Sequence, residues 1–394
     1  MKPSGIGGQA LMEGVMMKNG SHYACAVRKP DGTIVVDDQR TVLLGDKYKF
    51  FKLPIIRGVV TFVESLIIGV KTLTWSASFF DEDENDKDKD GNEEKPKEKT
   101  KEDKRKENIL IGVLVVFSIA LAIGLFMILP YFISKALKNV IESQLLLAFL
   151  EGLIRITLFV SYVAAISCMK DIKRVFMYHG AEHKSINCVE SGYELNVENV
   201  RKCSREHKRC GTSFLLIVMV ISIFFFMFIR FDKTIFMILG RLILIPLIAG
   251  ISYEFIRLAG RTDNKIITVL SRPGLALQKL TTREPDDSMI ECAIASVEAV
   301  FDWRAYQEDL RAEAEKKRQE DEQKKKEKRQ KREEEIKRRL EAKGITEEEM
   351  SEEKIKEIDE KADMLAADEK NEEIGESIAR EAADRAKSGK LFDE

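Results

Sequence analysis

The sequence has no excess of charge of either sign. Lysine and arginine number 64 and aspartate and glutamate 66, so the formal net charge of the 394 residues is −2. The strongly charged run 81–107 also mixes both signs, whereas nucleic-acid-binding proteins concentrate basic residues. This run has too few apolar residues to build a core, and it predicts a disordered linker. We therefore expect no nucleic-acid partner.

Two long stretches lack charged residues altogether. Residues 108–134 and 211–229 are uncharged and rich in aliphatic and aromatic side chains, a pattern typical of membrane-spanning helices. Two further apolar stretches, 144–169 and 234–256, contain isolated charges: Glu151, Arg155, Arg241 and Glu254. The sequence therefore predicts about four transmembrane helices, two within 108–169 and two within 211–258.

Basic residues flank these stretches on one side of the membrane. They precede the first and third and follow the second and fourth, and such residues concentrate on the cytoplasmic side. Residues 1–8 lack the apolar region of a cleavable signal peptide. We expect a multi-pass protein of the cell membrane with both termini and the loop 170–210 in the cytoplasm.

The N-terminal region predicts a small β-element followed by a helix. Apolar residues flank Pro30-Asp31-Gly32, which predicts a β-hairpin within residues 1–50. The glycines between residues 5 and 14 are expected in tight turns. Residues 51–80 are mostly apolar but carry Arg57, Glu64 and Lys71 seven residues apart. Such a charged stripe predicts an interfacial or re-entrant amphipathic helix rather than a full span.

The C-terminal region is predicted to be helical and charged. Residues 259–302 predict a cytoplasmic segment with an amphipathic helix that begins near Asp286. Residues 303–394 are dominated by Glu, Lys, Arg and Ala, which predicts a long helical tail stabilised by i,i+4 ion pairs; its protein partners are not indicated. The expected fold class is thus mainly α: a polytopic helical membrane protein with a small N-terminal β-hairpin and a charged tail.

Histidine is scarce, which makes its placement informative. Of four histidines in the chain, His179 and His183 lie four residues apart, with Glu182 between them. On a helix both imidazoles can bind one metal ion, while the carboxylate can accept a proton from metal-bound water. His207 and Cys210 follow in the same loop. The three histidines of this loop and Cys210 predict a divalent metal site, zinc being the expected ion. Glu182 is the expected catalytic base.

The site leaves several functions open. With three protein ligands, the third expected to be His207, the metal keeps a water position, as in a hydrolase acting at the inner leaflet on a membrane-bound peptide or a lipid. With all four ligands it is a structural zinc site in a non-catalytic scaffold or regulator. Cys210, Glu190 and Glu254 are the other candidate third ligands, although an ion pair with Arg257 is the expected role of Glu254. The histidines could also simply pack.

Membrane lipids are the expected partners of the basic residues near the spans. Lys184 and Arg209 lie beside the predicted site and could stabilise negative charge in a reaction. Interaction with anionic lipid is the expected role of both.

Four short motifs occur in order along the chain, at residues 7–17, 179–184, 209–214 and 281–285. In these motifs, and from about residue 5 to 300, the chain resembles the YqhQ family of bacterial membrane proteins. The resemblance implies a membrane protein of unknown function, and the family's general label implies a metal-dependent enzyme. Inverted-zincin peptidases share only residues 179–183 and are large soluble proteins, so peptidase activity does not follow.

Overall fold

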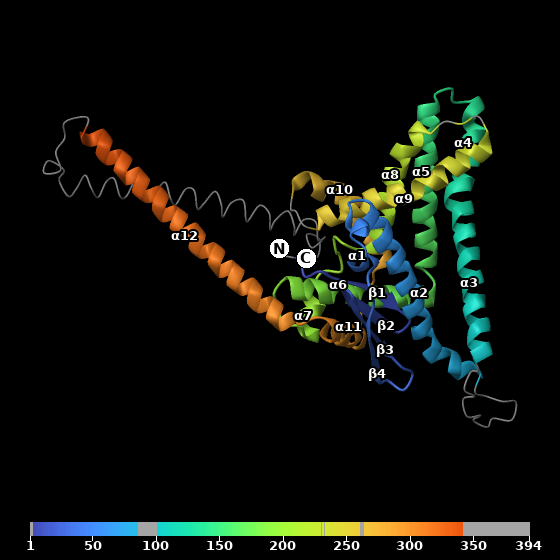
Figure 1. Ribbon diagram of the computed structural model, residues 1–394, viewed down its shortest axis with the longest axis horizontal. Coiled ribbons are helices and arrows are strands. Elements are labelled where there is room, and N and C mark those ends of the chain that lie inside the picture. The colour runs from blue at the N-terminus through green and yellow to red at the C-terminus, as the bar shows by residue number, and fades with distance from the viewer. Residues whose placement is uncertain (1–2, 86–100, 230, 232, 261–263, 342–394) are drawn as a thin grey trace, which may run out of the picture. The chain divides into compact units, whose positions relative to one another are not determined.

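The computed structural model describes residues 3–85, 101–229, 231, 233–260 and 264–341 (Figure 1). Its strands are β1 (Ile6–Leu11), β2 (Gly14–Asn19), β3 (His22–Arg28) and β4 (Ile34–Arg40). The first helices are α1 (Leu44–Lys47), α2 (Ile56–Asn85), α3 (Lys101–Ile123), α4 (Leu129–Ala136) and α5 (Gln144–Ile166). The later helices are α6 (Lys170–Glu190), α7 (Val197–Lys202), α8 (Gly211–Phe228), α9 (Thr234–Ala259), α10 (Lys265–Thr281), α11 (Asp287–Val300) and α12 (Trp303–Glu341). Contacts divide the chain into two compact units, Met1–Arg311 and Ala312–Glu394.

The N-terminal strands form a four-stranded antiparallel meander in the order β1-β2-β3-β4. Strands β3 and β4 are the predicted hairpin, with Val27 opposite Val35. The sheet is larger than that hairpin because β1 and β2 extend it. Gly7 and Gly8, which were expected in tight turns, instead lie inside β1.

Helices cover both faces of the sheet (Figure 1). On one face, Met17 of β2 packs in a buried cluster with Ala181 of α6 and Ala293 of α11. On the other face, Met16 packs with Ile68 of α2. Neighbouring residues of a strand point to opposite faces, so β2 contributes to both clusters. The sheet therefore lies between α2 on one face and α6 on the other.

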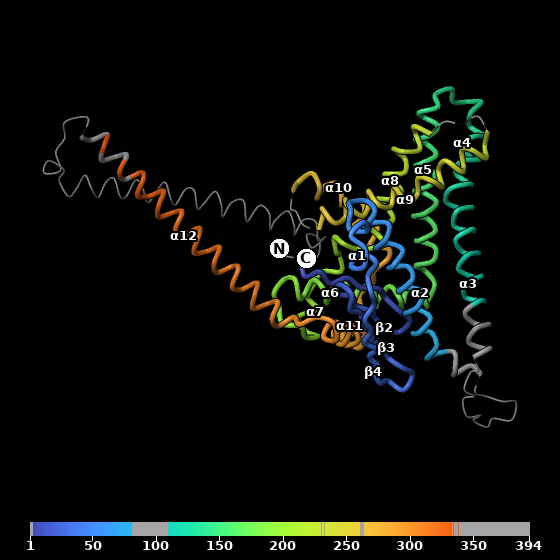
Figure 2. The backbone as a smooth tube through the Cα atoms, in the orientation of Figure 1, coloured from blue at the N-terminus to red at the C-terminus, as the bar shows by residue number. Residues whose placement is uncertain are grey.

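Four helical segments are long and apolar enough to cross a membrane: Ile109–Asn139, α5, α8 and α9. Their positions agree with the four predicted spans. In the first, the chain runs from α3 into α4 (Figure 2), and a π-helical turn, Gly124–Ile128, joins the two helices. The orientation of the spans, and the cytoplasmic placement of the termini, stay predictions.

Helix α2 takes the place of the predicted interfacial segment 51–80 and packs along α9. Each of its three regularly spaced charges has a partner within the protein. Arg57 pairs with Glu254 of α9, Glu64 accepts a hydrogen bond from the first backbone amide of α1 (2.7 Å), and Lys71 donates to the Tyr23 hydroxyl (3.3 Å). The charged stripe is therefore used in tertiary contacts, and an interfacial position for α2 stays a prediction.

The predicted linker 81–107 is helical at both ends, because α2 continues to Asn85 and α3 begins at Lys101. Its central part, 86–100, lies outside the described residues. Residues 259–302 hold two helices, α10 and α11, where one was predicted. Helix α11 begins as expected, since the Asp286 side chain accepts from the Met289 amide (3.0 Å).

The first part of the tail forms helix α12, which includes an i,i+4 ion pair between Arg318 and Glu322 (3.3 Å). The rest of the predicted helical tail, 342–394, lies outside the described residues.

Candidate metal centre

His179, Glu182 and His183 lie on α6, as their spacing predicted, and the two imidazole centroids are 4.4 Å apart. Gly180 lies beside them because another segment crosses the helix there. A Cβ atom at Gly180 would lie 2.0 Å from the carbonyl oxygen of Arg283, and the Arg283 amide donates to the α6 backbone (2.8 Å). The motif 281–285 therefore lies directly on the motif 179–184.

Backbone carbonyls orient both histidines. His179 Nδ1 donates to the Thr281 carbonyl (2.8 Å), and His183 Nδ1 donates to the Arg205 carbonyl. A carbonyl only accepts, so the Nδ1 atoms carry the protons and the Nε2 atoms keep their lone pairs. This is how second-shell groups usually prepare histidines for metal binding. Among the described residues, the buried Nε2 of His183 has no hydrogen-bond partner.

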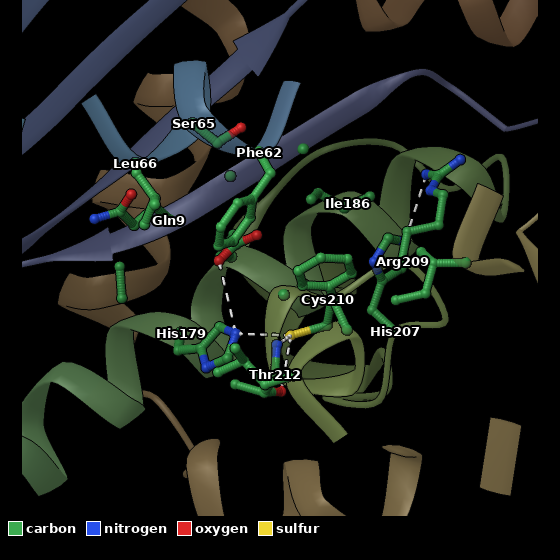
Figure 3. Close-up of a pocket in the computed structure, with 18 of the residues that line it drawn as sticks. Gln9, Phe62, Ser65, Leu66, His179, Ile186, His207, Arg209, Cys210 and Thr212 are labelled. Carbon is green, nitrogen blue, oxygen red and sulfur yellow. Dashed lines mark hydrogen bonds and ion pairs between the residues drawn. The ribbon is translucent and has the colours of Figure 1, made fainter. Parts of the chain in front are cut away.

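Cys210 contributes a third possible ligand atom. It caps the N-terminus of α8, where its Sγ accepts from the Thr212 amide (3.4 Å), and the same Sγ lies 3.3 Å from His179 Nε2. Figure 3 shows the His179 and Cys210 side chains directed toward each other. The ligand atoms of His179, His183 and Cys210 all lie within 4.8 Å of one another. Ligands of tetrahedral zinc lie about 3–4 Å apart, so small side-chain shifts would complete a three-ligand site.

Glu182 points its carboxylate into the same place. Its side chain is buried, its Oε2 is 4.0 Å from His179 Nε2, and this oxygen has no hydrogen-bond partner among the described residues. Burial raises the pKa of Glu182 to about 7, although the neighbouring His179 and a hydrogen bond from the Gly8 backbone amide act in the opposite direction. The Glu182 carboxylate therefore lies on the same side of His179 Nε2 as the possible ligand atoms and keeps one oxygen without a described partner.

Gly8 explains why the glycine-rich N-terminus belongs to the site. A Cβ atom there would lie 2.8 Å from Glu182 Cγ and 2.8 Å from the Met16 carbonyl oxygen. Only a residue without a side chain lets β1 approach Glu182 this closely. The glycines of motif 7–17 were visible in the sequence, but they predicted tight turns. Nothing in the sequence indicated that one of them contacts Glu182.

His207 lies near the cluster but is not one of the residues whose ligand atoms come together. Its ring centroid is 5.6 Å from that of His183, while its Nε2 is 3.8 Å from Glu190 and 3.5 Å from Arg209. Burial lowers the pKa of His207, an effect that the Glu190 carboxylate opposes. Gln278 holds the loop by donating to the His207 carbonyl and accepting from its amide, both at 2.8 Å.

Glu190 is used for structure rather than for the cluster. It pairs with Arg209 and accepts from the Ser4 amide (2.8 Å) and hydroxyl (2.7 Å). Burial acts to raise the pKa of Glu190, but interactions with His207, Arg209 and Ser4 outweigh it and lower the pKa to about 2. A carboxylate held in this way ties the N-terminus to the end of α6.

The remaining candidate residues, Lys184 and Glu254, also form contacts with other protein groups. Lys184 is buried, pairs with Glu284 and donates to the Arg201 carbonyl (2.7 Å), so its contacts in the structure are with protein groups. Glu254 forms an ion pair, as expected, but its direct partner is Arg57 of α2 rather than Arg257. The Arg57 guanidinium donates to both carboxylate oxygens of Glu254, from Nε to Oε1 at 2.6 Å and from Nη2 to Oε2.

A cavity of about 600 Å³ adjoins the cluster. His179, Glu182 and Cys210 lie at its polar side, and Gly8 contributes from β1. Apolar side chains from the candidate membrane helices and α2 form much of the remaining wall: Phe62, Leu66, Phe214, Leu215 and Ile256. Figure 3 shows Phe62 and Leu66 across the cavity from His179. The cavity therefore joins a ligand cluster to an apolar wall.

The fold and site define a helical protein with four candidate membrane spans and a histidine–cysteine cluster backed by a small sheet. The chain belongs to the family described as "Protein of unknown function (DUF1385)", whose model matches residues 53–303. It is 33% identical over 307 residues to "Uncharacterized protein YqhQ" of Bacillus subtilis (strain 168), covering 78% of this chain and 95% of that protein. No solved structure is significantly similar. The YqhQ resemblance is confirmed, whereas neither description names a metal or an enzymatic activity.

Proposed function

We propose that this protein is a metal-dependent hydrolase in which His179, His183 and Cys210 hold a divalent ion, with zinc the best match to the ligands. The observation that carries the proposal is the buried Nε2 of His183, which has no partner among the described residues. Leaving a buried acceptor unsatisfied costs about 1–3 kcal/mol. A cation between this nitrogen, the second imidazole and the thiolate removes that cost.

The arrangement favours an open coordination position. The ligand atoms that come together belong to three residues, and catalytic zinc sites usually have three protein ligands and a water. His207, the expected third ligand, instead lies against Glu190 and Arg209. The cluster therefore supports the hydrolase more than a four-ligand structural site.

Glu182 is the proposed proton acceptor. Bound zinc lowers the pKa of its water to about 7, which supplies a nucleophile at neutral pH. The unpartnered Oε2 of Glu182 lies 4.0 Å from a ligand nitrogen, within reach of a water held beside it. The Gly8 amide orients the carboxylate from the other side. In this role Glu182 takes the proton as the water attacks.

The cavity wall favours a substrate with a hydrocarbon portion. Phe62 and Leu66 of α2 and Phe214 of α8 offer apolar contact beside the cluster, and binding pockets match the polarity of what they hold. A lipid or a membrane-bound peptide has this chemistry. The predicted orientation would place the reaction at the inner leaflet.

The test compares the full-length wild type with Glu182→Gln and, as a matched control, Glu206→Gln at an exposed position of the loop 203–210. Proteoliposomes of phosphatidylethanolamine and phosphatidylglycerol provide the lipid substrate, and a palmitoylated peptide provides the peptide substrate. Mass spectrometry measures hydrolysis products. We expect metal-dependent product from the wild type and the control, with a loss of about a hundredfold or more in Glu182→Gln at unchanged metal content.

The alternative is a structural metal that ties α6 to the start of α8, which its histidine and cysteine ligands favour. In that case Glu182→Gln leaves folding, metal content and cellular function unchanged. No product from either substrate class in the metal-loaded wild type contradicts the proposed hydrolase.

A further inference from the structure

We propose a phosphate-binding site in a second cavity, of about 550 Å³, at the C-terminal end of α8. The candidate metal centre lies at the other end of this 18-residue helix, which makes the two sites about 27 Å apart along the helix axis. The phosphate belongs to a lipid headgroup or to a small soluble molecule. The two sites share no lining residue, so this proposal is independent of the hydrolase.

A buried charged group forms the inner wall of this cavity. Glu151 of α5 pairs with Arg241 of α9 through two hydrogen bonds and with Arg155 one turn along α5 (2.9 Å). All three side chains are at most 6% exposed. Two guanidinium groups share one carboxylate, so the group carries one excess formal positive charge. Such a charge is costly between apolar helices unless an anion neutralises it.

The two arginines differ in how fully they are bonded. Arg155 Nε donates to the Phe126 carbonyl (2.8 Å), which lies in the π-helical turn, and its Nη1 donates to Ser222 (3.1 Å). A π-helical turn commonly frees backbone groups for other partners. By contrast, the buried Nε of Arg241 has no partner among the described residues. Arg241 also lines the cavity, so the spare donor belongs to the residue beside the open space.

The rim of the cavity adds three exposed basic residues, Lys135, Lys138 and Lys233. Lys135 Nζ donates to the Thr234 hydroxyl (3.1 Å), which keeps it at the rim. Glu151 is the one acidic residue among the described lining residues, and it is already engaged by both arginines. The cavity is therefore strongly positive for its size, and such a field concentrates anions.

Phosphate is the anion that this arrangement fits best. Its oxygens can accept from a guanidinium and from several ammonium groups at once. Apolar residues between the basic ones, including Leu147, Phe236 and Met237, provide room for the glycerol and first methylenes of a lipid. A free phosphate compound would use the basic groups alone.

The experiment uses the full-length protein in nanodiscs of phosphatidylcholine. One arm measures binding of radiolabelled inorganic phosphate by equilibrium dialysis. The other arm adds phosphatidylglycerol and measures by native mass spectrometry how much stays bound. The site variant replaces Lys135, Lys138 and Lys233 with Gln, and the matched control replaces Lys170, Lys173 and Lys265, three exposed lysines outside the cavity. Thermal unfolding midpoints check that both variants fold.

We expect the site variant to weaken binding by about tenfold or more, because three charges are lost from one cavity, and the control to change it less than about twofold. Retention of phosphatidylglycerol without binding of inorganic phosphate identifies the lipid headgroup as the source. Binding of inorganic phosphate without retention of phosphatidylglycerol identifies a soluble phosphate compound, and competition between the two probes shows that both bind the same cavity. Absence of saturable binding of both probes to the wild type, or equal losses in the two triple variants, overturns the proposal.

Discussion

At the N-terminal end of α8 the buried atoms without described partners include two acceptors, His183 Nε2 and Glu182 Oε2, whereas at its C-terminal end there is a donor, Arg241 Nε. Both ends are enclosed by packed helices and both adjoin a cavity. Both groups are buried, but the unpartnered atoms are acceptors at one end, which suit a cation, and a donor at the other, which suits an anion. The kind of atom left without a hydrogen-bond partner therefore distinguishes the two sites. The sequence composition alone shows only that both contain buried polar or charged residues.

The two ends also differ in what holds them. The histidines are oriented by backbone carbonyls of Thr281 and Arg205, whereas both buried arginines share one counter-charge, the Glu151 carboxylate. Changing a ligand at the first end should alter binding more than folding. Changing the carboxylate at the second end should alter folding directly.

The largest expected effect on stability is at Glu151. Glu151→Gln leaves two buried guanidinium groups without a counter-charge, which should lower the free energy of unfolding by about 3–5 kcal/mol. Glu182→Gln should lower it by less than about 1 kcal/mol, since an amide oxygen still accepts from the Gly8 backbone. Unfolding in mixed micelles measures both. Equal stability of the two variants would remove the distinction between the two ends.

His183→Ala should lower metal affinity by about a hundredfold or more, because loss of second-shell groups alone costs about 10–100-fold. His207→Ala is the matched control, and it should retain the metal because its imidazole lies against Glu190 and Arg209. Competition with a fluorescent zinc chelator measures both affinities. A larger loss of metal affinity in His207→Ala than in His183→Ala would instead support His207 as a metal ligand, as the sequence predicted.

Gly8→Ala should destabilise the protein by about 1–3 kcal/mol, because the added methyl group overpacks the site. It would meet Glu182 and the Met16 carbonyl at 2.8 Å, whereas a Cβ atom at the neighbouring Gly7 meets nothing within 4 Å. Gly7→Ala is therefore the control and should be close to wild type. Similar thermal unfolding midpoints for the two variants would contradict the close approach of β1 to α6.

The smallest effect is expected at Glu254. Its ion pair with Arg57 joins side chains that are 26% and 30% exposed, and partly exposed pairs contribute about 0–1 kcal/mol. Glu254→Gln should therefore barely change the unfolding midpoint and should leave the metal content as in the wild type. Loss of metal in this variant would bring Glu254 back as a ligand.

Features set by local sequence could be predicted, and those set by long-range contacts could not. The apolar spans and the helical spacing of His179 and His183 depend on residues near one another in the chain. The contact of Gly8 with Glu182 depends on the packing of β1 against α6. This contact joins residues far apart in the chain and leaves no periodic pattern in the sequence. The glycines of the first motif therefore could not be assigned to the site.

Helix α10 was missed because its sequence contains strong helix-breaking signals. Pro273 lies inside the helix and Gly274 follows it, a combination that ordinarily indicates a turn. In the structure a Cβ atom at Gly274 would lie 2.9 Å from Ser213 of α8. Tertiary packing of α10 against α8 therefore outweighs the local preference. The same packing places Gln278 where it fixes the His207 loop.

The most direct test of the account is the metal content of the full-length protein purified without chelators, measured by inductively coupled plasma mass spectrometry. A site formed by His179, His183 and Cys210 predicts about one equivalent of zinc or another divalent transition metal per chain. Less than about a tenth of an equivalent, unchanged after incubation with zinc, would contradict the central claim.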